Sequence, residues 1–120
     1  MLVQVESAGG LTNLGAIAAT EGVDGVFFGP ADLAASMGLL GKTGDARVQD
    51  AIARGIKTVR TAGKAAGVLS ADPTVARQYL TAGALFVAVG IDTTLLVRAA
   101  RDLRALFKDA GGPPQSPQLR

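Results

Sequence analysis

The chain has 120 residues, 48% of them hydrophobic and 4% aromatic, with 16 Gly and no Cys, His or Trp. The lack of His and Cys excludes Ser-His-Asp and Cys-His nucleophiles, a His-ligated zinc ion and disulfides, so any acid-base or metal chemistry must use carboxylates, Lys, Tyr79, backbone or water. The 12 Lys and Arg against 10 Asp and Glu give a formal charge of +2, and no aromatic residues interleave with the basic ones, so we expect no nucleic-acid partner.

The longest uncharged stretches fall short of the roughly 20 apolar residues that a membrane-spanning helix needs. The N-terminus carries no charged region ahead of its first apolar residues, which is unlike a secretory signal. We therefore expect a cytoplasmic domain with no membrane partner.

Short apolar runs alternate with segments of helical period along the chain, and both predict regular structure. The predicted strands are residues 2–6, 25–29, 66–69 and 85–90. The predicted helices lie within residues 11–19, 31–37, 48–62, 75–80 and 96–107. Helix N-caps are expected at Asp45, Asp72 and Asp92. Helix ends are expected at Gly22, Gly63 and Gly83.

This alternation indicates βαβ units with right-handed crossovers around a parallel sheet. Because the strands are too apolar for exposed sheet edges, we predict an α/β fold that is half of a (βα)₈ TIM barrel, with four βα units in residues 1–109. Residues 110–120, rich in Gly, Pro and Gln, are expected to form a disordered tail. An independent flavodoxin-like domain is a weaker alternative, because it leaves Gln4 and Glu6 unexplained on a buried strand.

Two of the ten acids are placed where a strand ends and a βα loop begins, the edge that carries active sites in parallel α/β folds. Alternation along the first strand puts Gln4 and Glu6 on one face, with Val3 and Val5 on the other. Glu6 ends that strand, and Asp32 follows the second strand. Adjacent strands would bring both carboxylates to one rim.

Two carboxylates and an amide form an oxygen-rich site that suits Mg²⁺ or Mn²⁺. The backbone N–H groups of Ala31 and Asp32, at the start of a short helix, are placed to receive a substrate carboxylate. A metal beside such an anion site would suit an α-keto acid and would stabilise its enolate. Taken singly, Asp32 is equally well explained as a charge that complements the helix dipole.

The segments LVQVES, DGVFFGPADLAASMG, AGKAAGVLS and ALFVAVGIDTTLL resemble the second half of the HpcH/HpaI class II pyruvate aldolases. The resemblance runs from about Leu2 to Phe107. It implies a divalent metal, Mg²⁺ or Mn²⁺ with Co²⁺ as a further candidate, held by Glu6 and Asp32. The substrate contacts that it implies are Gln4, Ala31, Asp32 and Leu69.

The implied reaction is the reversible cleavage of a 4-hydroxy-2-oxo acid to pyruvate and an aldehyde. The resemblance also implies a homo-oligomer, which is a hexamer in intact relatives. Family members take a His base and an Arg from the first half of the barrel, whereas this chain has no His. We therefore expect a truncated aldolase that keeps the metal and pyruvate half-site, contributes no catalytic residue and is inactive alone. The alternative is a noncatalytic half-barrel that self-associates through its open edges as a binding or structural module.

Overall fold

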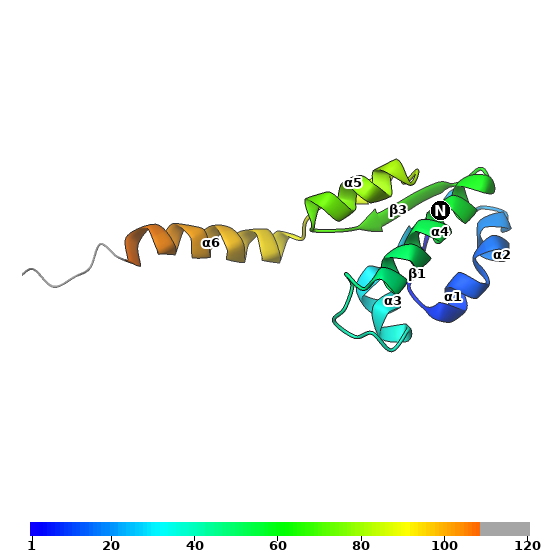
Figure 1. Ribbon diagram of the computed structural model, residues 1–120. Helices are drawn as coiled ribbons and strands as arrows, with labels where there is room; N and C mark the ends of the chain where they lie inside the picture. Colours follow the sequence, from blue (N-terminus) through cyan, green and yellow to red (C-terminus); the bar gives the residue numbers. More distant parts are fainter. Residues whose placement is uncertain (109–120) are drawn as a thin grey trace, which may run out of the picture. The chain divides into compact units, whose positions relative to one another are not determined.

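The computed structural model describes residues 1–108, which fall into two units that meet between Val89 and Gly90 (Figure 1). The first unit contains a four-stranded parallel sheet in the order β1-β2-β3-β4. Its strands are β1 (Leu2–Val5), β2 (Gly25–Phe28), β3 (Ala65–Leu69) and β4 (Phe86–Ala88). The predicted tail, residues 110–120, lies outside the described residues, and the predicted domain 1–109 stays a prediction.

Helices follow every strand, as the alternation predicted. They are α1 (Ala8–Thr12), α2 (Leu14–Ala19), α3 (Pro30–Ser36), α4 (Ala46–Thr61), α5 (Pro73–Thr81) and α6 (Asp92–Lys108). The single helix expected within residues 11–19 is instead two, because Asn13 has a nonhelical ψ of 7° and ends α1. The Asn13 side-chain amide donates to the Gly9 carbonyl oxygen at 3.0 Å, which stabilises this break.

The sequential strand order explains why the sheet has one covered face. Within the first unit, crossovers of the usual right hand between successive neighbours would put the helices on one side of the sheet. The strand residues that face them are buried in the core: Val5, Val26, Phe28, Ala66 and Val68. A doubly wound flavodoxin-like sheet would reverse its strand order, so that alternative is wrong for the described sheet. The fold is α/β with the four βα units of half a TIM barrel.

Helix α4 packs closely on β2 because Gly55 has no side chain. A Cβ at Gly55 would lie 2.7 Å from Cζ of Phe28, which is fully buried. The rest of the buried face of α4 is aliphatic, with Ile52 and Ile56 both fully covered. Burial of each such side chain contributes roughly 1.5–3 kcal/mol, so this contact is a main part of the core.

Two of the three predicted caps are confirmed. Asp45 accepts a hydrogen bond from the Arg47 N–H at 3.0 Å, and Asp72 accepts one from the Thr74 N–H at 2.7 Å. Asp92 is itself the first residue of α6 rather than the residue before it. The predicted helix ends have left-handed backbone at Gly22, Gly63 and Gly83.

The second unit consists of α6 and its flanking residues, and its helix has no buried residue. Its apolar side chains are exposed, among them Leu96, Leu103 and Phe107. No helix within residues 1–108 is both long and apolar enough to span a membrane.

Candidate functional site

Gln4 and Glu6 form a hydrogen-bonded pair where β1 ends. Gln4 Nε2 donates to Glu6 Oε2 at 2.5 Å. Gln4 is exposed and Glu6 half-buried, whereas Val5 between them is buried against the helices. Alternation along β1 therefore puts the amide and the carboxylate together on the helix-free face, as the sequence predicts.

Gly29, between β2 and α3, lies directly against this pair. Its N–H donates to the Val5 carbonyl oxygen at 3.3 Å, which joins the ends of β1 and β2. A Cβ at Gly29 would lie 2.8 Å from Glu6 Oε2 and 3.0 Å from Gln4 Nε2. The carboxylate and the amide thus occupy space that any other residue at position 29 would fill.

Asp32 lies in the first turn of α3, three residues after Gly29, and is exposed. The structure places it after β2 and Glu6 after β1, at the same end of two paired parallel strands. Residues 1–108 contain no cluster of three or more acidic side chains that could hold a metal. A cation bound by Glu6 and Asp32 would take its remaining ligands from water, substrate or the Gln4 amide. This all-oxygen donor set fits Mg²⁺ or Mn²⁺.

Ala31 and Leu69 line one pocket of about 250 Å³, so the structure brings two of the predicted substrate contacts together. The other lining residues are Pro30, Thr43, Ser70, Ala71, Asp72 and Tyr79. Burial raises the pKa of Tyr79, which is 4% exposed. Sequence reasoning missed Thr43 and Tyr79 as pocket residues, because no motif marks either one.

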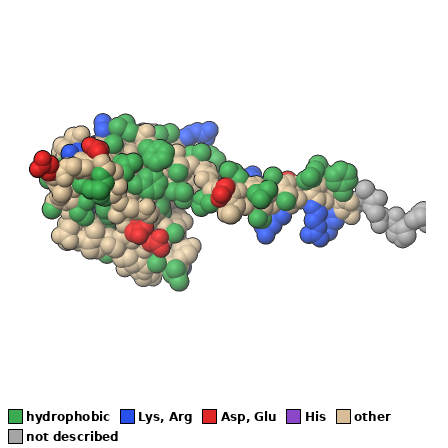
Figure 2. Space-filling view, turned by 180° about the vertical axis from the view of Figure 1, so that it is seen from behind, with side chains coloured by type: hydrophobic (Ala, Val, Ile, Leu, Met, Phe, Trp, Pro, Cys, Tyr) green, Lys and Arg blue, Asp and Glu red, His purple; other side chains and the backbone are tan. Residues whose placement is uncertain are grey.

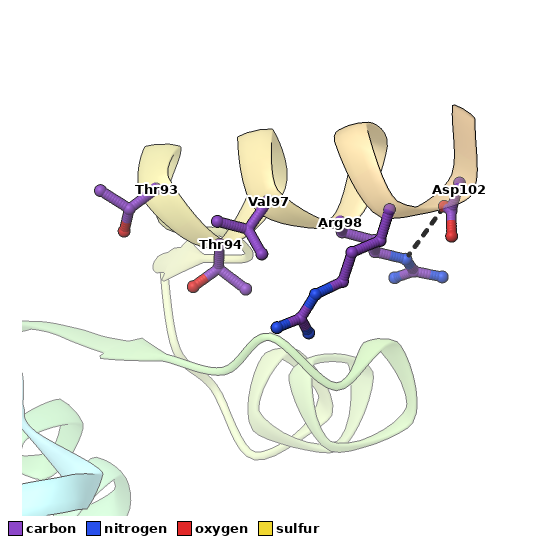
Figure 3. Close-up of a pocket in the computed structure, with 6 residues that line it drawn as sticks. Thr93, Thr94, Val97, Arg98 and Asp102 are labelled. Atoms are coloured by element: carbon purple, nitrogen blue, oxygen red, sulfur yellow. Dashed lines mark ion pairs between the residues drawn. The ribbon is translucent and has the colours of Figure 1, made fainter. Parts of the chain in front are cut away.

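A second hollow, of about 520 Å³, runs along α6 and is not the candidate site (Figure 3). Its lining side chains all come from this one helix and are exposed. Arg98 Nε lies 4.0 Å from Asp102, one turn away, in an ion pair of little energetic weight. The basic residues of α6, like its other side chains, are exposed.

Comparison with known proteins agrees with the fold and shows the family. The family described as HpcH/HpaI aldolase/citrate lyase matches residues 1–99. A hydroxypyruvate/pyruvate aldolase from Pseudomonas aeruginosa is 61% identical over 114 residues, 95% of this chain and 42% of that protein. A 4-hydroxy-2-oxo-heptane-1,7-dioate aldolase from Salmonella paratyphi B is 51% identical over 107 residues, 89% of this chain and 41% of that protein.

A solved structure shows the same likeness. The crystal structure of an HpcH/HpaI aldolase/citrate lyase family protein from Burkholderia cenocepacia superposes with a TM-score of 0.82 at 44% identity. The match covers 89% of this chain and 42% of that chain. The chain therefore spans less than half the length of these relatives.

Proposed function

Because the chain belongs to the HpcH/HpaI aldolase/citrate lyase family, we propose that it carries the metal and 2-oxo acid half-site of a metal-dependent pyruvate aldolase. The observation that carries this proposal is the hydrogen-bonded Gln4–Glu6 pair, which lies against Gly29 where β1 and β2 end. The names of two relatives support pyruvate or hydroxypyruvate as the oxo acid and a 4-hydroxy-2-oxo acid as the cleaved compound.

The reaction breaks the bond between C3 and C4 of the 4-hydroxy-2-oxo acid. The 4-hydroxyl loses its proton and becomes the aldehyde carbonyl, while the electron pair of the broken bond passes into the enolate of the pyruvate part. The enolate then takes a proton at C3. When bound, a divalent cation supplies positive charge that stabilises the negative charge developing on a substrate oxygen.

The residues of the half-site divide into two groups. Glu6 and Asp32 would hold the cation, and Gln4, Ala31, Asp32 and Leu69 would contact the oxo acid. The pocket beside Ala31 and Leu69, at about 250 Å³, has room for a three-carbon acid, since one water occupies about 30 Å³. The family resemblance implies a His base from the first half of the barrel, and this sequence contains no His, so the 4-hydroxyl proton would pass to that base and we expect no turnover by this chain alone.

Calorimetric titration of the chain with Mn²⁺ tests the half-site. We expect Glu6→Gln and Asp32→Asn each to weaken Mn²⁺ binding at least tenfold, because each substitution removes an anionic ligand. Asp45→Asn is the matched control, since Asp45 caps α4 through the Arg47 N–H, lines no part of the candidate pocket and should leave the affinity unchanged. Equal Mn²⁺ affinity in all three variants would refute the site.

The exposed face of the sheet supports a second candidate function, that of a noncatalytic module that self-associates. Leu2 is 60% exposed on β1 and Phe86 is 56% exposed on β4, and both strands are edges of the described sheet. Figure 2 shows hydrophobic side chains gathered on the surface seen from behind Figure 1. Under either function, the homo-oligomer and the cytoplasmic location stay predictions.

A further inference from the structure

We propose that Gly29 is a positioning residue of the half-site, which holds the Gln4 amide and the Glu6 carboxylate in place because it has no Cβ. The part of this inference that concerns the cation rests on the proposed function. The part that concerns the Gln4–Glu6 pair stands on the contacts alone.

With the Gln4 amide and the Glu6 carboxylate where they are, a side chain at position 29 would collide with both. A Cβ there would lie 2.8 Å from Glu6 Oε2, 3.0 Å from Gln4 Nε2 and 3.1 Å from Glu6 Cβ. A Cβ that has a neighbour closer than 3.0 Å forces something to shift, and the shift costs little where the neighbour is the far end of a flexible side chain, as Glu6 Oε2 is. Two of the three crowded atoms are the donor and the acceptor of the 2.5 Å hydrogen bond, so the shift would fall on the pair itself.

The backbone at Gly29 does not require glycine. Its φ of −99° and ψ of 93° lie in the extended region that any residue adopts, and extended backbone is what a residue before proline favours. Gly63, in contrast, has a φ of 74°, where a side chain would be strained. At position 29 glycine is therefore needed for space, and its replacement by alanine tests that space without straining the backbone.

The neighbouring strand restricts where the pair could move. Phe27 is the partner of Gln4 in the β1–β2 register. Its ring packs on that of Phe86 with the centroids 5.6 Å apart, over Gly67, where a Cβ would lie 2.8 Å from Phe27 Cδ2. These rings occupy the next positions of the same row and bound the pair on the β2 side only.

The side-chain amide signal of Gln4 in a ¹⁵N-labelled sample of the full chain reports on the pair without any metal. The signal is assigned by its loss in Gln4→Ala. We expect Glu6→Gln to shift it in the wild-type background and in Gly9→Ala, a control near the site with no heavy atom within 4 Å of its Cβ position. We expect no such shift in Gly29→Ala. A shift of the same size in Gly29→Ala would overturn the proposal.

If Gly29→Ala folds poorly, urea unfolding decides whether the added side chain crowds the Gln4–Glu6 pair. The substitution is made in the wild type and in a Gln4→Ala/Glu6→Ala background, where the crowded polar atoms are gone. We expect it to lower the unfolding midpoint more in the wild type. Equal lowering in both backgrounds, or loss of folding in both, would show that the crowding is not with this pair.

Mn²⁺ titration connects the pair to the proposed cation. We expect Gly29→Ala to weaken Mn²⁺ binding at least tenfold and Gly9→Ala to leave it unchanged. Unchanged binding in Gly29→Ala would overturn the role of Gly29 in the cation site. If the wild type does not bind Mn²⁺, the proposed function fails, and the Gln4 amide signal still decides whether Gly29 positions the pair.

Discussion

Asp45 should make the stability of the fold depend on pH in the acidic range. Its carboxylate forms an ion pair with Arg47 at 2.8 Å and accepts from the Arg47 backbone N–H at 3.0 Å. The Arg47 guanidinium first, and then that N–H, lower the pKa of Asp45 from 3.8 to about 2. A carboxyl whose pKa is lower in the folded state stabilises the fold above its unfolded pKa, and this stabilisation is lost as the pH falls toward the folded value.

We therefore expect wild-type stability to fall between about pH 4 and pH 2 partly through Asp45. Asp45→Asn should lessen the pH dependence in this window, since asparagine still caps a helix but carries no charge. Arg47→Gln should lessen it as well, because it removes the main cause of the lowered pKa. Thermal unfolding followed by circular dichroism across this range checks both variants, and an unchanged slope in both would contradict the assignment.

Residue positions were predictable where one local rule decides them. Alternation along β1 put Gln4 and Glu6 on one face, and the hydrogen bond between them agrees. The role of Gly29 was not predictable, because its need for space arises from contact between the ends of two strands that are distant in the sequence. The pocket residue Tyr79 was not predictable for another reason: no motif marks it, and only the packed structure shows that it lines the pocket with Ala31 and Leu69.

At the scale of elements, the close contact of α4 with β2 depends on Gly55. A Cβ there would lie 2.7 Å from the buried ring of Phe28, so Gly55→Ala should overpack the core and destabilise the fold by about 1–3 kcal/mol. Gly15→Ala is the matched control in α2, because no heavy atom lies within 4 Å of its Cβ position. Alanine there should raise stability by about 0.5–1 kcal/mol. Urea unfolding measures both, and a stabilising Gly55→Ala would contradict the packing.

The elements themselves were predictable from apolar periodicity, and the exceptions have local causes. The break between α1 and α2 escaped prediction because Leu11, Leu14 and Ala18 keep helical spacing across it. The nonhelical ψ of 7° at Asn13 and the hydrogen bond from its side-chain amide to the Gly9 carbonyl oxygen mark the break in the structure. The strand order was predictable as well, since four successive βα units joined by right-handed crossovers favour neighbouring strands.

At the scale of the whole molecule, each unit exposes apolar surface that monomeric proteins usually bury. In the first unit, Leu2, Leu85 and Phe86 are each more than half exposed on the edge strands of the described sheet or beside them. In the second, α6 buries none of its residues. Such surfaces favour association, and unpaired strand edges add backbone groups that can pair with another chain.

We therefore expect the 120-residue chain to self-associate as its concentration rises, which light scattering during size-exclusion chromatography would measure. Phe86→Asp should move the distribution toward monomer, because it puts a charge on the helix-free face of the edge strand β4. Leu40→Asp is the control: Leu40 is 80% exposed, more than Phe86, but lies in the connection between α3 and α4 and not on a strand. If both substitutions reduce association equally, general hydrophobicity rather than the sheet face is responsible. A wild-type chain that stays monomeric at every concentration would contradict the prediction, and the noncatalytic self-associating module would lose its main support.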